Sequence, residues 1–424
     1  MKYKAKPFDI WQSVYIDEHE PLSRYIIAFA THIDPDVLAQ AVELSKQTLP
    51  MVGCGLEGGF FAARWVDKGF SGKDIVRVVP MEGDLHSTLL QCFTEPIDFA
   101  QQSHVRLYII REESKDTLCI TVSHILCDGT GLKEYVRLLG ILYTACSTGG
   151  QAPEQQFHER GTRPLLANYR RRDILRLFAK DSKYNPYKYT SRMKHLVFPP
   201  DGGEARPNLI LRELSGERWA GLRQYAQGSG TTLNDILLAA FARSVGKAFD
   251  MQVFPMSLTV DMRKMVPEGT SYGITNLTSA CMCDVRLHEG DTLADTATQI
   301  DQQMAFFRNR ENTMKPVLLV DFLSHVLPYR PLLAFYRIIA SKYSSSLSNT
   351  GVLRDDARDF AGLPVEKSFI VSQVFRSGCF HVVVSTFRDC CSLTCATYAS
   401  PERRAMLEGL LDRLVSELYT ACGL

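Results

Sequence analysis

A strand-like segment, a histidine loop and a helix follow one another in the first third of the chain. This succession restricts the fold more than any other feature. Within residues 117–123, all but the final Ser123 are apolar or β-branched, as in a buried strand. His124 ends this run, Asp128 follows four residues later, and Gly129 precedes apolar residues at helical spacing that continue to Leu142. A strand that leads directly into a helix is typical of α/β layers.

Strand and helix signals alternate through the rest of the 424 residues. Asp34-Pro35-Asp36 predicts a helix start, with an N-cap, a proline at the first helical position and an acid in the first turn. Thr232 predicts a second capped helix, and 401–419 a terminal one. Further strands are predicted at 25–30, 60–66, 107–110, 209–213, 253–260, 277–285, 368–375, 380–386 and 392–398.

These signals form two blocks, separated by a stretch rich in Pro, Gly, Arg and Lys. We therefore predict an α/β protein with an N-terminal subdomain at 1–165, a connection at 166–205 and a C-terminal subdomain at 206–424. Within the connection, residues 169–195 are strongly basic. A solvated helix and loop explain this charge, and a patch for coenzyme A phosphates or an acidic carrier protein is the alternative.

Composition excludes several classes of function. A net charge of +1 gives no general attraction to nucleic acid or anionic membranes. The twelve cysteines are scattered without a Cys-x-x-Cys pair, which predicts reduced thiols and no structural zinc. The chain shows neither an apolar leader nor an apolar run of membrane-spanning length. We expect a cytoplasmic protein with no metal, no permanently bound cofactor and no membrane span.

The stretch from Met314 to Ala340 is ambiguous. Its apolar residues keep helical spacing on both sides of a break at Pro328. Burial in the second subdomain is the plain interpretation, and a lid or membrane-surface helix that admits an apolar substrate is the alternative. Peripheral membrane contact is therefore left open.

The chemistry of His124 suits a general base. A polar residue at the end of a buried-type strand carries a desolvation cost, so its presence there favours a functional role. An imidazole with an ordinary pKa near 6.5 can take a proton from a hydroxyl or amine at cellular pH.

The pattern His124-x-x-x-Asp128-Gly129 resembles the signature of the chloramphenicol-acetyltransferase-like superfamily, which includes condensation domains, plant BAHD acyltransferases and alcohol acyltransferases. Val260-Asp-Met-Arg263 resembles the superfamily segment whose arginine pairs with the aspartate of the signature. The resemblance implies that Asp128, Gly129 and Arg263 support the loop of the catalytic His124. A bidentate guanidinium would fix that geometry better than a lysine.

Two more segments resemble parts of the superfamily. Ser346-Leu-Ser348-Asn349-Thr-Gly351 is similar to a Ser-Asn-x-Gly segment, which implies that Ser348 and Asn349 bind substrate or the developing oxyanion on the far wall of a tunnel. Tyr272-Gly-Ile-Thr-Asn276 is similar to a stretch of condensation domains, although an ordinary turn explains it equally well.

The resemblance implies two chloramphenicol-acetyltransferase-like subdomains in a pseudo-dimeric arrangement, with a tunnel at their interface and some exchange of segments. Condensation domains usually have two adjacent histidines, whereas Ser123 precedes His124 here, and the Asp-Phe-Gly-Trp-Gly segment of BAHD enzymes is absent. Both departures favour a free-standing enzyme of the alcohol-acyltransferase type.

The implied function is acyl transfer from a thioester, either acyl-CoA or an acyl chain on a carrier protein's phosphopantetheine arm, to a small alcohol or amine. One alternative is a catalytically silent relative that serves as a binding scaffold. Another is an amide-forming condensation enzyme that uses a carrier protein in trans.

Overall fold

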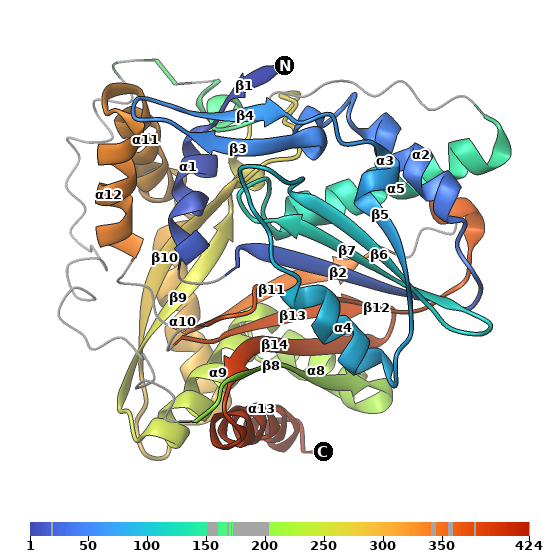
Figure 1. The fold of residues 1–424 in the computed structure, drawn as a ribbon. Helices are drawn as coiled ribbons and strands as arrows, with labels where there is room; N and C mark the ends of the chain where they lie inside the picture. The colour runs from blue at the N-terminus through green and yellow to red at the C-terminus, as the bar shows by residue number, and fades with distance from the viewer. Residues whose placement is uncertain are drawn as a thin grey trace.

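The computed structural model describes residues 1–17, 20–150, 160–167, 169–170, 172, 203–340, 345–354, 359–376 and 379–423. Most of the predicted connection at 166–205, with its basic stretch, lies outside these residues. The described chain forms two large sheets and one small sheet, with helices packed on their faces (Figure 1).

The first large sheet carries the histidine strand at its centre. Its order is β12-β2-β7-β6-β5, so that β7 is paired on both edges. The strands are β2 (Leu22–Phe29), β5 (Val76–Pro80), β6 (Val105–Arg111), β7 (Asp116–Ser123) and β12 (Val365–Val371). Every residue of β7 is buried, which agrees with the apolar run that predicted it. Around this sheet pack α2 (Pro35–Ser45), α3 (Gly72–Ile75), α4 (Leu85–Thr94) and α5 (Gly129–Thr148).

Both helix starts predicted from capping residues are confirmed. The Asp34 carboxylate accepts hydrogen bonds from the backbone N–H groups of Asp36 and Val37 at the start of α2. Thr232 caps α9 (Leu233–Phe249) in a reciprocal arrangement with Asp235.

The strand predicted at 60–66 begins too early. The small sheet consists of β1 (Lys2–Lys4), β3 (Cys54–Gly58) and β4 (Ala63–Asp67), and α1 (Pro7–Ser13) follows β1 in the chain. A hydrogen bond of 3.0 Å from Gly59 N to Ala62 O closes the turn between β3 and β4. Phe60 and Phe61 therefore lie in this turn, 56% and 78% exposed, and their apolar character does not indicate a strand.

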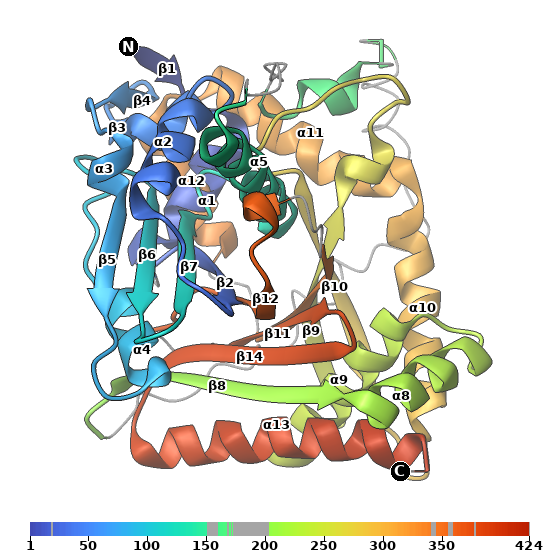
Figure 2. The same cartoon turned by 90° about the vertical axis from the view of Figure 1, so that its right-hand side faces the viewer.

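The second large sheet has the order β10-β9-β11-β13-β14-β8. Its strands are β8 (Arg206–Ser215), β9 (Val253–Asp261), β10 (Thr278–Arg286), β11 (Ser346–Leu353), β13 (His381–Phe387) and β14 (Cys390–Ala399). The helices α8 (Gly216–Gly228), α9, α10 (Leu293–Arg308) and α13 (Pro401–Ala421) cover one face of it, and α13 runs along the outer side in Figure 2.

The two halves exchange a segment. Strand β12 comes from the last part of the chain but pairs antiparallel with β2 in the first sheet. The chain leaves the second sheet after β11, forms β12 in the first sheet and returns to the second sheet at β13. The interface between the halves is therefore built by strands that cross it, and the predicted boundaries at 165 and 205 stay predictions.

The ambiguous stretch from Met314 to Ala340 forms α11 (Arg310–Val326) and α12 (Tyr329–Ala340), with the break at Pro328 as predicted. Val317, Leu318, Leu332 and Tyr336 are buried, whereas a second set is exposed: Phe322, Val326, Phe335 and Ile338. One face thus joins the core and another meets solvent. Across the described residues, no helix combines the length and apolar character needed to cross a bilayer.

Candidate active site

His124 lies directly after the last residue of β7, where the chain leaves the first sheet. Its backbone N–H donates to Pro21 O at 2.5 Å, so the loop stays attached to the segment that leads into β2. Asn276 Nδ2 donates to the carbonyl oxygens of His124 and Ile125 at 2.9 and 3.2 Å. The backbone of the histidine is therefore fixed from both halves of the protein.

The imidazole itself is partly buried, and no group among the described residues hydrogen-bonds its Nδ1. Burial lowers the pKa of His124, although the nearby negative charge of Asp128 opposes this shift. The ring is consequently neutral at cellular pH and can accept a proton.

The Asp128 carboxylate is buried, and both of its oxygens accept hydrogen bonds. Its Oδ2 accepts from Arg263 Nη1 at 3.0 Å, from Leu277 N at 2.7 Å and from Thr278 Oγ1 at 2.8 Å. Its Oδ1 caps α5 by accepting from Gly131 N at 2.9 Å. Burial alone raises the pKa of Asp128, but the charge of Arg263 and these hydrogen bonds hold it below its ordinary value.

Arg263 contacts several segments at once. Besides Asp128 it binds Thr275 O through Nη2 at 2.9 Å and Asp261 Oδ1 through Nη1 at 3.3 Å. Its Nε lies 3.7 Å from the Glu134 carboxylate on α5. The guanidinium is 5% exposed, so this ion pair is a structural tie across the interface.

Gly129 and Gly131 differ in how much space their surroundings leave for a side chain. A Cβ on Gly129 would lie 3.5 Å from Thr350 Cγ2, which is ordinary contact, and Gly129 is not among the described glycines with positive φ. A Cβ on Gly131 would lie 2.7 Å from Cys127 Cβ and 3.1 Å from Thr275 O. Gly131, which the sequence did not single out, is therefore the position where close packing excludes a side chain.

A second histidine reaches the interface, and the sequence reasoning missed it. Val382 and Val384 of β13 pack into the core of the second half, whereas Val383 packs into the core of the first. Because side chains alternate along a strand, His381 shares the side of Val383. Its Nδ1 lies 2.6 Å from Ser346 Oγ on β11.

A charge on the imidazole of His124 affects the pKa of His381. Burial, together with the repulsion of a positive charge on His124, lowers the pKa of His381 to about 4. His381 is thus a second neutral imidazole at the interface. A lone histidine at the start of an apolar strand carries no sequence pattern that would reveal this.

The structure separates Ser348 from Asn349. On β11, Ser348 pairs with Val383 and shares the side of His381, and its Oγ lies 3.4 Å from Thr259 Oγ1. Asn349 pairs with Val384 and lies on the opposite side, where its Oδ1 accepts from Gly351 N at 2.9 Å. Substrate binding by either residue stays a prediction, and this geometry favours Ser348.

The segment around Asn276 matters more than its resemblance suggested. Asn276 donates to the backbone of His124, and Leu277 and Thr278 donate to Asp128. The segment is itself held by Arg160, whose Nε donates to Ile274 O at 3.0 Å. Arg160 also pairs with Asp9 at 3.0 Å, and both side chains are buried. A second buried ion pair therefore fixes the segment around Asn276, and no local pattern predicts this pair because its members are 151 residues apart.

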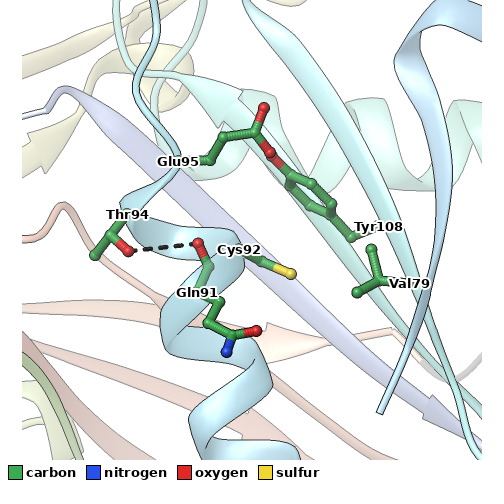
Figure 3. A pocket seen from close by; sticks show the side chains of 6 residues that line it. All are labelled: Val79, Gln91, Cys92, Thr94, Glu95 and Tyr108. Atoms are coloured by element: carbon green, nitrogen blue, oxygen red, sulfur yellow. Dashed lines mark hydrogen bonds between the residues drawn. The ribbon is translucent and has the colours of Figure 1, made fainter. Parts of the chain in front are cut away.

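A separate hollow of about 420 Å³ between α4 and the strands β5 and β6 does not belong to this site (Figure 3). There, Tyr108 OH donates to the Glu95 carboxylate at 2.8 Å. The Cys92 thiol faces this hollow, but burial raises its pKa to about 11 and makes it a poor nucleophile.

Comparison with known families gives the class of the protein. The Condensation domain family matches residues 81–308, more than half of the chain and the part that contains His124, Asp128 and Arg263. The chain belongs to the condensation-domain family, and its fold consists of two chloramphenicol-acetyltransferase-like halves. No curated protein matches the chain.

Solved structures share this fold at low sequence identity. Polyketide synthase associated protein 5 from Mycobacterium tuberculosis is similar at a TM-score of 0.67, with 14% identity over 98% of both chains. The first condensation domain of the calcium-dependent antibiotic synthetase gives 0.71, with 13% identity over 100% of this chain and 96% of that one. The trichothecene 15-O-acetyltransferase from Fusarium sporotrichioides gives 0.70, with 11% identity over 98% and 95%.

Proposed function

We propose that this protein is an acyltransferase in which His124 acts as the general base. The observation that carries the proposal is a neutral imidazole at the interface of the two halves, on a loop held by Asn276 and by the Asp128–Arg263 pair. A base must be unprotonated before it can act, and the lowered pKa of His124 and its fixed backbone support this role.

In the proposed reaction, His124 takes the proton of the acceptor hydroxyl or amine while the acceptor atom bonds to the thioester carbonyl carbon. The tetrahedral oxyanion collapses, the carbon–sulfur bond breaks, and the imidazolium returns its proton to the departing thiolate. No covalent enzyme intermediate is needed because a thiolate is already a good leaving group. Ser348 and His381 share the interface side of their strands and are candidates for holding the acceptor or the oxyanion. A tunnel along this interface is part of the proposal.

Members of the fold that transfer acetyl groups and members that condense substrates both support acyl transfer as the general reaction. The donor is coenzyme A or a carrier protein, and the product is an ester or an amide. A silent scaffold is the competing interpretation, and it predicts no chemistry that depends on His124.

The test is mass-spectrometric detection of product and free coenzyme A from a panel of acyl-CoA donors, with and without mixed alcohols and amines. We expect His124→Ala to reduce the rate by about 10²- to 10⁴-fold. The matched variant His381→Ala removes another imidazole from the same interface and should reduce the rate less. The same assay is repeated with acyl chains attached to carrier proteins. Equal transfer rates for the native protein and His124→Ala with every donor would contradict the proposal.

A further inference from the structure

A cavity of about 530 Å³ lies beside the proposed site, between the two halves. The first half contributes β2 and α5 to its wall, and the second contributes the end of β11, the segment that leads into β12, and the end of β13. Figure 2 shows α5 next to this part of the chain. Its volume falls within the usual range for small-molecule sites.

The charge of the wall is unlike that of the whole protein. Among the described residues that line the cavity, four are cationic, namely Lys133, Arg137, Arg354 and Arg388, and one, Glu134, is acidic. The described lining therefore carries +3 even when Glu134 is ionised, whereas the 424-residue chain carries +1 in total. Burial raises the pKa of Glu134 to about 7, so part of its negative charge is absent at neutral pH.

The cations come from different elements and converge on one space. Lys133 and Arg137 are separated by one helical turn on α5 and so project from the same side of it. Arg354 follows β11, and Arg388 stands in the tight turn between β13 and β14 with a φ of 50°. The Lys133 ammonium donates to Thr350 O, which uses one of its three donors and ties α5 to the β11 segment.

The cavity also lies next to the loop that carries His124. Thr130, which lines it, comes directly after Gly129. At the rise of a β-strand, His381 and Arg388 are about 23 Å apart along β13 and its turn. A ligand with an anionic end among the arginines and an extended chain toward His124 would fit this span.

We propose that this cavity binds the multiply phosphorylated nucleotide end of a free coenzyme A thioester, so that the donor is acyl-CoA and not an arm attached to a carrier protein. The proposal rests on the proposed acyl transfer. A carrier-bound arm has one phosphodiester with one negative charge, whereas coenzyme A carries a diphosphate and a ribose phosphate. Three to four net positive charges match the second ligand, because arginine forks bind phosphate oxygens in pairs.

The experiment is calorimetric titration of the full chain with coenzyme A, dephospho-coenzyme A and pantetheine at two salt concentrations. We expect affinity to fall in that order and to weaken in higher salt. The variant Arg137→Glu/Arg354→Glu should weaken coenzyme A binding by about tenfold or more for each reversed charge. The milder variant Arg137→Gln/Arg354→Gln should bind coenzyme A with an affinity between those of the Glu variant and the native protein.

The matched control is Arg218→Glu/Arg413→Glu, which makes the same change of charge on exposed residues of α8 and α13 and should bind like the native protein. Equal affinity for coenzyme A and pantetheine, no binding of coenzyme A, or native affinity in the Arg137/Arg354 variants would each overturn the proposal.

A His124→Ala sample separates this proposal from the proposed function. It should bind coenzyme A like the native protein while it fails to transfer. Charge-dependent binding without transfer from any donor supports the cavity and contradicts the acyltransferase. Transfer that depends on His124 and uses only a carrier-bound donor, without coenzyme A binding, supports the enzyme and overturns the cavity.

Discussion

Two groups of charges lie close together at the start of α5, and they are arranged in opposite ways. Asp128 and Arg263 are enclosed, and each is bound by several partners from both halves. Arg137 and Arg354 border a cavity and are exposed. Enclosed charges must be neutralised within the protein, whereas exposed charges keep their capacity for a ligand. The difference indicates that the first group holds the shape of the site and the second can recognise a substrate.

The largest effect should come from breaking the enclosed pair. Asp128→Ala leaves Arg263 buried without its main partner and should lower the free energy of unfolding by about 3–5 kcal/mol. Urea denaturation measures this loss. In Asp128→Ala/Arg263→Met the unpaired charge is gone, so part of the stability should return. A loss below about 1 kcal/mol for Asp128→Ala would show that the pair is not the tie described above.

A smaller loss of folding stability is expected when Asn276 is replaced, because the carbonyls of His124 and Ile125 then lose the Asn276 side-chain donor. Asn276→Ala should cost about 1–3 kcal/mol and also reduce kcat. Asn208→Ala is the matched control, because Asn208 Nδ2 likewise donates to two carbonyls, those of Arg206 and Ala399, away from the histidine. Similar destabilisation in both variants with a kcat loss only at Asn276 is the expected result, and equal kcat losses would contradict a specific effect on the loop.

Glu134 lies between the two groups, since it approaches Arg263 and also lines the cavity. Its pKa rises from 4.5 to about 7 on folding, mainly through burial. The folded state therefore favours the protonated form, and the native protein loses stability as the pH rises from 4.5 through 7.

Glu134→Gln should remove this dependence and be more stable than the native protein by about 1–2 kcal/mol at pH 8, with the advantage disappearing below pH 4.5. Thermal unfolding across this pH range measures it. A difference that does not change with pH would contradict the raised pKa.

The smallest effect on stability belongs to the exposed arginines. Arg137→Ala and Arg354→Ala should each change the free energy of unfolding by no more than about 0.5 kcal/mol, because neither side chain is buried. Urea denaturation checks this. A large loss at either position would place it with the enclosed group and end the contrast between the two.

The sequence by itself determined the local parts of this protein. Residues 117–123 with His124, the caps at Asp34 and Thr232, and the alternation of strands and helices were readable because hydrophobic period and capping act over a few residues. The partnership of Asp128 with Arg263 was also predicted, but through resemblance to a superfamily and not through any local rule.

Only the tertiary structure decided how distant segments meet. Strand β12 pairs in the first sheet, and His381 and Ser346 come together at the interface. The cationic cavity likewise assembles residues from α5, β11 and the β13 turn. Such contacts depend on strand order and on the exchange of segments between halves. No periodicity within a single segment records that arrangement, because the partners lie on different strands and helices, 35 residues apart for Ser346 and His381 and 217 for Lys133 and Thr350.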